Sequence, residues 1–243
     1  GQTDAPDGFT HYLMKFDGVS EHNKSQETFG DPLGYGAMEY VYHLMAKECD
    51  IDMMPCRLLN EGDRRHFITQ RFDRKDNNKV HVQTLNALEH VSYKKVASYS
   101  YAELFSTARK LNLSPQDAIQ LFKRMVFNVV ARNHDDHAKN FGFILDHDNN
   151  WQLAPAYDLA YSYKPDSLWV SKHWMTLNGK QDNFSRADFH SFEKLSPIFS
   201  KRKIDDILNN TIEVVSSWSK LSTDQGVPQP LIKEISQNLR LAI

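Results

Sequence analysis

Hydrophobic residues follow a strand pattern near the start of the chain and a helical pattern soon after it. The run FTHYLMKF, residues 9–16, is rich in aromatic and β-forming residues and is bounded by glycines, which predicts a strand that carries Lys15. Residues 35–51 then repeat apolar side chains at helical spacing. We therefore predict a helix there, with Glu39 in its first turns.

The next segments complete a small strand-rich unit. Residues 56–74 indicate a β-hairpin that turns around residues 60–64 and leads into residues 67–72. A polar stretch with little periodicity follows, over residues 74–100, and we interpret it as a connection. The pattern predicts a first lobe over residues 1–75.

Helical patterns dominate the second part of the chain. Residues 100–113 have a helical pattern, and a longer one begins after Ser114, a favourable N-cap that is followed by Pro115. Two short apolar strands, FGFIL and WQLAP, flank the turn sequence DHDNN and predict a second hairpin. Further helices are expected at residues 203–219 and 230–242. The second lobe is thus mainly helical and covers residues 76–243, and the fold class is α+β.

Composition and charge indicate the class of protein and the compartment in which it is expected. The chain has 243 residues, 40% of them hydrophobic, and a formal net charge of -2, as in globular proteins. This balance gives no argument for nucleic acid or membrane as the main partner, and no apolar window is long enough for a membrane helix. Cys49 and Cys56 form no metal-binding motif, which favours a reducing compartment, the cytoplasm.

Two motifs concentrate the candidate chemistry, RNHDDHAKNFGF at residues 132–143 and YDLAYS at residues 157–162. The predicted hairpin between them brings Asn140 beside Asp158, because antiparallel strands place their outer ends together. An amide oxygen and a carboxylate are hard ligands that suit Mg²⁺. Asp135 precedes Asn140 by five residues, the interval of the protein-kinase catalytic loop, which predicts a general base beside the metal.

The first lobe supplies the other parts of a kinase site. Lys15 on a strand, followed by Glu39 on a helix, has the order of the ion pair that holds the phosphates of ATP in kinases. The Lys15 side chain on an apolar strand needs a partner for its charge, and Glu39 is the one we predict.

Another interpretation of the first motif is a metal cluster. His134 and His137 with Asp135 and Asp136 could belong to a metal-dependent phosphohydrolase, but no second motif supplies further ligands. On the kinase interpretation, Asp136 is expected to be a solvated or capping residue.

The sequence resembles the HipA-type serine/threonine kinases, the toxins of bacterial toxin–antitoxin systems. The resemblance lies in HDDHAKNFGF, LAPAYDL, QRFDR and MKF, together with the helix that contains Glu39. It implies a two-lobed protein-kinase-like fold and transfer of the ATP γ-phosphate to a protein hydroxyl. Asp135 matches the catalytic aspartate, and Asn140 and Asp158 match the Mg²⁺ ligands.

The resemblance also implies ligand contacts and partners. The residues that match ATP contacts are Lys15, Glu39, Gln70, Arg71, Phe72, His137, Lys139, Asn140, Tyr157 and Asp158. Family members phosphorylate aminoacyl-tRNA synthetases and are held by a DNA-binding antitoxin, so a protein substrate and such an antitoxin are the expected partners.

The chain departs from the family at the glycine-rich phosphate loop. That loop precedes the strand lysine, whereas only fourteen residues precede Lys15 and the glycines of GDPLGYG follow it. We expect an N-terminal subdomain or a separate polypeptide to supply the loop. The alternative function is an inactive kinase-like module that binds an antitoxin or a DNA-bound partner.

The basic run at residues 201–203 is interpreted as a solvated helix start rather than a nucleic-acid contact. The core candidates are Phe122, Phe127, Trp151 and Trp218.

Overall fold

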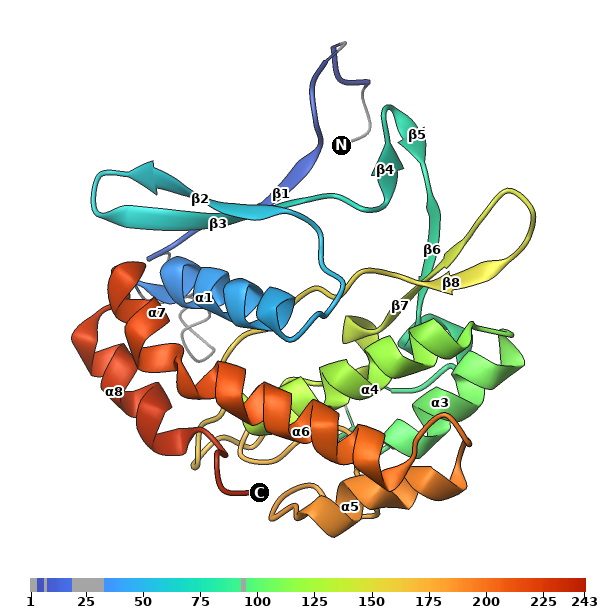
Figure 1. Cartoon of the computed structure of the whole chain (residues 1–243). Helices are drawn as coiled ribbons and strands as arrows, with labels where there is room; N and C mark the ends of the chain where they lie inside the picture. Colours follow the sequence, from blue (N-terminus) through green and yellow to red (C-terminus); the bar gives the residue numbers. More distant parts are fainter. Residues whose placement is uncertain (1–3, 7, 19–32, 93–94) are drawn as a thin grey trace.

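The computed structural model describes residues 4–6, 8–18, 33–92 and 95–243, and it has two lobes (Figure 1). Among the described residues, the smaller one has a three-stranded sheet and one helix, and the larger one is mainly helical. The α+β class predicted from the sequence is confirmed. The division after residue 75 stays a prediction.

The small lobe is an antiparallel sheet with a helix packed against it. Its strands are β1 (Tyr12–Lys15), β2 (Cys56–Glu61) and β3 (Arg64–Gln70), in the order β1-β3-β2. The predicted strand and hairpin are present, although β1 is shorter than the run that predicted it. Because β3 is central, it fixes the register of Lys15, which lies opposite Phe67.

Helix α1 (Tyr35–Glu48) packs very closely on this sheet. Gly36 allows the approach, since a Cβ atom there would lie 1.9 Å from the carbonyl oxygen of Arg65. One turn later, Glu39 is buried beneath the sheet. Part of the GDPLGYG sequence lies outside the described residues; Leu33 and Gly34 form a turn that leads into α1.

The polar stretch that we interpreted as a connection contains regular structure, so that interpretation was wrong. It includes β4 (Arg74–Lys75), β5 (Asn78–Lys79), β6 (His81–Thr84) and α2 (Leu85–Leu88). Strand β6 joins a second sheet in the order β6-β7-β8. Its pairing partner lies about sixty residues along the chain, and such short, partly exposed strands leave no local periodicity to detect.

The second hairpin was predicted correctly. It consists of β7 (Gly142–Leu145) and β8 (Trp151–Leu153), with Phe143 opposite Leu153.

The larger lobe is built around α4 (Pro115–Val130), whose middle and end are buried. The Ser114 side chain accepts from the Asp117 backbone N–H, and the Asp117 carboxylate accepts from the Ser114 N–H, which makes a capping box. The surrounding helices are α3 (Tyr101–Lys110), α5 (Arg186–His190), α6 (Lys201–Ser216), α7 (Trp218–Asp224) and α8 (Gln229–Asn238), with 3₁₀ turns η1 (Ala138–Asn140) and η2 (Ser191–Lys194).

One predicted helix is divided in the structure, and one helix was not predicted. The helix expected at residues 203–219 is divided at Ser217 into α6 and α7. The short helix α5 was not predicted, because its five residues show too few turns for a helical period.

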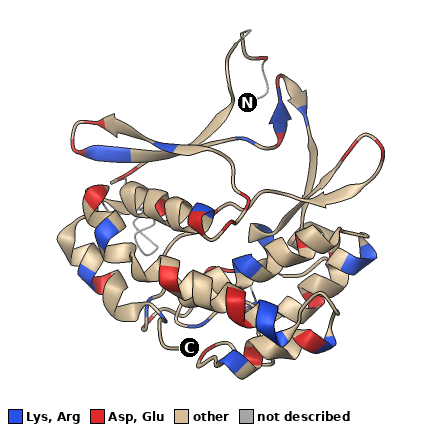
Figure 2. Cartoon of the chain, viewed as in Figure 1, with Lys and Arg blue, Asp and Glu red and all other residues tan. Residues whose placement is uncertain are grey.

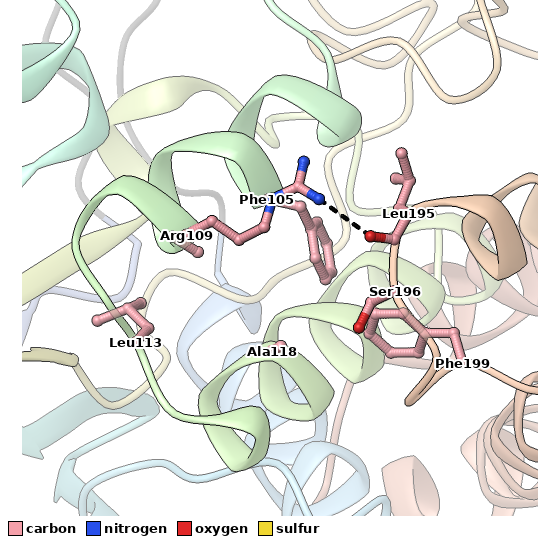
Figure 3. Close-up of a pocket in the computed structure, with 8 residues that line it drawn as sticks. Phe105, Arg109, Leu113, Ala118, Leu195, Ser196 and Phe199 are labelled. Carbon is pink, nitrogen blue, oxygen red and sulfur yellow. Dashed lines mark hydrogen bonds between the residues drawn. The ribbon is translucent and has the colours of Figure 1, made fainter.

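Most of the expected core residues are buried, namely Phe122, Phe127 and Trp218. Trp151 is only partly buried at the start of β8. A hollow of about 60 Å³ lies between α3, α4 and the segment at residues 195–199, lined by core residues such as Phe105 and Phe199 (Figure 3). At its edge, the Arg109 guanidinium donates to the Leu195 carbonyl oxygen at 3.0 Å.

Charged residues of both signs are interspersed along both lobes, with Lys and Arg among Asp and Glu (Figure 2). The basic run at residues 201–203 opens α6, where Lys201 and Arg202 are exposed, as expected. Within the described part of the chain, no helix has both the length and the apolar character that crossing a bilayer requires.

Candidate functional site

Lys15 lies where the two lobes meet and contacts an acidic side chain from each. Its Nζ atom is 2.7 Å from Glu39 Oε1 and also donates to Asp158 Oδ1. The ion pair with Glu39 that we predicted is therefore present. Burial lowers the pKa of Lys15, but the two carboxylates outweigh that effect and raise the pKa above its ordinary value. The ammonium group is thus charged at neutral pH.

Glu39 makes this contact energetically necessary. Only 7% of its side chain is exposed, whereas 42% of the Lys15 side chain is. A carboxylate so far from water is costly unless a positive charge accompanies it. The packing of α1 on β3 therefore fixes Glu39, and Glu39 fixes the end of the lysine side chain.

The loop after α4 presents Asp135 toward the same region. The Asp135 backbone N–H donates to Ser162 Oγ at 2.9 Å, and the Asn140 amide nitrogen donates to the Asp135 carbonyl oxygen at 2.8 Å. These bonds hold the backbone on both sides of the residue, and 43% of the side chain remains exposed. This bond occupies the Asn140 amide nitrogen, so the amide oxygen is the atom that could ligate a metal.

The charges around Asp135 shift its acidity. Desolvation raises the pKa of this carboxyl group above its ordinary value, and the negative charge of Asp158 adds to the rise. His137, whose Nε2 atom is 3.6 Å from Asp135 Oδ1, acts in the opposite direction, and so does Lys15. Asp135, Asp158 and Lys15 are thus close enough to influence one another.

The second hairpin brings Asp158 to this place. The Ala154 N–H donates to the Gly142 carbonyl oxygen, and the Tyr157 hydroxyl donates to the Lys139 carbonyl oxygen at 2.7 Å. The two ends of the hairpin therefore lie side by side, as the sequence predicted. Asp158 itself has a φ of 58°, in the left-handed region that residues other than glycine seldom adopt.

Three of the residues that match ATP contacts, Gln70, Arg71 and Phe72, lie at the end of β3 and directly after it. Gln70 ends the strand, and the Arg71 backbone N–H donates to the His11 carbonyl oxygen. The Arg71 guanidinium pairs with Asp73, so its side chain is directed to that carboxylate. The Phe72 ring stacks on Tyr157 with 5.7 Å between centroids and joins the two lobes.

A cavity of about 210 Å³ opens beside Lys15. Its lining residues are Leu13, Lys15, Glu39, Met53, Cys56, Phe67, Thr69, Tyr157, Asp158 and Leu159. The ion-paired residues lie among apolar side chains, the usual composition of a small-molecule site. Of these, the sequence predicted Lys15, Glu39, Tyr157 and Asp158, and it missed the six others, Leu13, Met53, Cys56, Phe67, Thr69 and Leu159. No local signal identifies Met53, which reaches the site because residues 52 and 53 bridge to Ala156.

One residue of the histidine-rich motif, Asp136, differs from its sequence prediction. We expected Asp136 to be a solvated or capping residue, but it is 1% exposed and accepts three hydrogen bonds. His134 is buried as well, and its ring lies 4.1 Å from that of His173. No three His, Cys, Asp or Glu side chains converge on a possible metal position within the described residues.

Comparison with known proteins identifies the family. The profile of the HipA-like C-terminal domain matches residues 2–218. The chain belongs to the HipA-like C-terminal domain family. Among curated proteins, this HipA-like chain is 24% identical over 212 residues to one named "Putative kinase Y4mE" from Sinorhizobium fredii (strain NBRC 101917 / NGR234). The match covers 80% of the chain and 50% of Y4mE, so the HipA-like chain spans about half the length of that relative.

Solved structures share the fold. HipA from the Shewanella oneidensis MR-1 toxin–antitoxin system, in a complex with HipB and operator DNA, superposes with a TM-score of 0.69 at 15% identity. This match covers 98% of the HipA-like chain and 64% of HipA. The Helicobacter pylori proinflammatory kinase CtkA gives a TM-score of 0.50 at 12% identity, with 94% and 87% of the two chains covered. The protein-kinase-like fold implied by the sequence resemblance is therefore confirmed.

Proposed function

We propose that this chain forms the nucleotide site and the transfer centre of a serine/threonine protein kinase of the HipA type. The observation that carries the proposal is the double contact of Lys15, which joins Glu39 of one lobe to Asp158 of the other. A lysine held in this way presents a fixed positive charge to the α and β phosphates of ATP.

Asp135 is the proposed general base. Its backbone is held by Ser162 and Asn140, so its carboxylate has a defined position from which to orient a protein hydroxyl and accept the hydroxyl proton. The raised pKa increases the affinity of the carboxylate for that proton.

The oxygen donors at the end of the hairpin fit magnesium. Asn140 contributes an amide oxygen and Asp158 a carboxylate, and Mg²⁺ is commonly held by one or two such groups together with substrate phosphates. These two residues would hold the ion, which would neutralise charge on the transferred phosphate. Gln70, Arg71 and Phe72 would bind adenine, and His137, Lys139 and Tyr157 would contact the nucleotide.

The proposed partners follow from the family and its solved member. A DNA-binding antitoxin is supported by the Shewanella oneidensis HipA structure, which contains HipB and operator DNA. The proposed substrate is a protein hydroxyl, and by resemblance an aminoacyl-tRNA synthetase.

Four single variants test the site. Mg²⁺-dependent ATP binding, measured by calorimetry, should be lost in Lys15→Met and strongly weakened in Asp158→Asn, because each removes a charge that faces the phosphates. Asn tolerates the left-handed backbone at position 158, so that variant tests the charge alone. Asp135→Asn should still bind ATP but transfer phosphate about 10² to 10⁴ times more slowly. Asp148→Asn, an exposed aspartate on the same hairpin, is the matched control.

Three other outcomes would each contradict part of this proposal. No binding at millimolar Mg²⁺-ATP contradicts the kinase proposal and supports an inactive module that binds an antitoxin or a DNA-bound partner. A tightly bound transition metal, found by elemental analysis, supports the phosphohydrolase instead. Full transfer activity in Asp135→Asn contradicts the assignment of the base.

A further inference from the structure

Asp136, the neighbour of the proposed base, is a buried carboxylate that accepts three short hydrogen bonds. Its Oδ2 atom accepts from the Tyr101 hydroxyl at 2.6 Å and lies 2.9 Å from His173 Nδ1. Its Oδ1 atom accepts from the Trp174 backbone N–H at 2.7 Å. Hydrogen bonds to an ionised group are stronger than neutral ones, so these contacts make Asp136 a rigid point in the loop.

The donors to Asp136 come from two different parts of the chain. Tyr101 is the first residue of α3, whereas His173 and Trp174 belong to the segment that follows Asp158. We call residues 162–174 the anchored segment. The carboxylate thus connects the loop that carries Asp135 to a segment about forty residues further along the chain.

The anchored segment also reaches Asp135 itself. At its beginning, Ser162 Oγ accepts from the Asp135 backbone N–H. At its end, the Trp174 ring lies edge-on to His137, with 5.8 Å between centroids, and His137 lies 3.6 Å from the Asp135 carboxylate. The segment therefore contacts the loop on both sides of the base.

We propose that Asp136 and His173 are positioning residues, which hold the anchored segment against the loop and so fix the orientation of the Asp135 carboxylate. The inference rests on the proposed function and adds two residues to its machinery. Without the contacts to Asp136, Trp174 withdraws from His137, and Ser162 no longer holds the Asp135 backbone in place. A displacement of about 1 Å at a reacting group is enough to slow a reaction about 10²-fold.

Limited proteolysis tests the anchoring without any catalysis. Lys172 is exposed and directly precedes the buried His173, so trypsin can report on how firmly this end is held. The other lysine of the segment, Lys164, precedes Pro165, a bond that trypsin does not cleave. Mass spectrometry of the fragment that begins at His173 follows the cleavage after Lys172. This cleavage should be about tenfold faster in Asp136→Asn, which loses charge-assisted hydrogen bonds.

The matched control is Asp188→Asn in α5. Asp188 is equally buried, at 1% exposed, and accepts from the Asn178 amide, the Lys180 ammonium and the Ser185 backbone. Its variant should cleave after Lys172 at the wild-type rate. If the control is cleaved as fast as Asp136→Asn, the effect is general destabilisation and the anchoring is wrong.

Two variants at His173 test the same hydrogen bond from its other partner, and they decide the question if Asp136→Asn does not fold. Asparagine can place an amide N–H where His173 Nδ1 lies, whereas leucine cannot. His173→Leu should be cleaved about tenfold faster than wild type, and His173→Asn should be closer to wild type. Equal cleavage of the two variants contradicts the role of the hydrogen bond.

Kinetics then test the link to Asp135. Asp136→Asn should lower kcat for phosphate transfer by about 10- to 100-fold, with KM for ATP within about twofold, since Asp136 lies outside the proposed nucleotide contacts. Faster cleavage with unchanged kcat contradicts the positioning role. If wild type transfers no phosphate, the proposed function has failed, and the proteolysis alone still decides whether Asp136 anchors the segment.

Discussion

At the scale of single residues, the site is determined by charges that are partly removed from water. Glu39 is buried and Lys15 is its partner, while Asp158 completes the contact from the other lobe. The same reasoning explains how Asp136 can be buried, although the sequence led us to expect a solvated or capping residue. A carboxylate at 1% exposure is tolerated because its hydrogen bonds replace those it would make with water.

The acidity of Asp135 leads to a prediction on pH. A general base acts when ionised, and burial raises the pKa of Asp135, so kcat/KM for transfer should rise through a midpoint above the ordinary aspartate value of about 3.9. His137 lowers that pKa, so His137→Gln should move the midpoint to higher pH. Each profile is normalised to its own plateau, because this variant also weakens a nucleotide contact.

Two results would contradict this account of the pH profile. One is a wild-type midpoint at the ordinary aspartate value. The other is a midpoint that moves to lower pH in His137→Gln.

At the scale of elements, α4 leads directly into the loop that carries the site. The helix begins at the capping box of Ser114 and ends beside Arg132, whose φ of 59° turns the chain into that loop. The amphipathic pattern of α4 and its cap were predictable, because both depend on neighbours three or four residues away.

Removing this cap should therefore destabilise the protein. Ser114→Ala leaves the Asp117 backbone N–H without its side-chain acceptor, and we expect a loss of about 1 kcal/mol in the free energy of unfolding. Urea denaturation followed by circular dichroism measures it. Ser106→Ala, within α3, is the control and should be nearly neutral, because alanine favours helix interiors. Equal losses in both variants would show that the cap contributes nothing.

At the scale of the whole molecule, the contacts of Lys15 and the stacking of Phe72 on Tyr157 join the two lobes. Lys15 and Asp158 are each more than 40% exposed, so their ion pair is screened by solvent and adds little stability. A ligand that contacts both lobes at once can stabilise the molecule more than this pair does.

Nucleotide should accordingly raise the stability of the whole protein. At a free Mg²⁺-ATP concentration one hundred times Kd, the unfolding free energy should rise by about 2.7 kcal/mol. Thermal unfolding with and without nucleotide measures the effect. Asp158→Asn should lose most of it at the same concentration, and Asp148→Asn should keep it. A rise of equal size in both variants would place the binding elsewhere.

The sequence by itself determined the features that depend on near neighbours. The capped helix α4, the hairpin on either side of DHDNN and the order of Lys15 before Glu39 could all be predicted, and the family resemblance joined them into one fold. The hairpin also leads us to predict that Asn140 and Asp158 approach each other, since antiparallel pairing follows from a short turn, and their shared metal site stays a proposal.

Only the tertiary structure decided the features that depend on distant partners. Strand β6 forms by pairing with β7, Met53 lines the cavity through a bridge to Ala156, and Asp136 is buried because His173 and Trp174 fold over it. None of these leaves a local pattern, because whether a polar side chain is buried depends on which remote segment covers it. The sequence thus named the residues that we propose for catalysis, and the tertiary contacts show which segments fold around them.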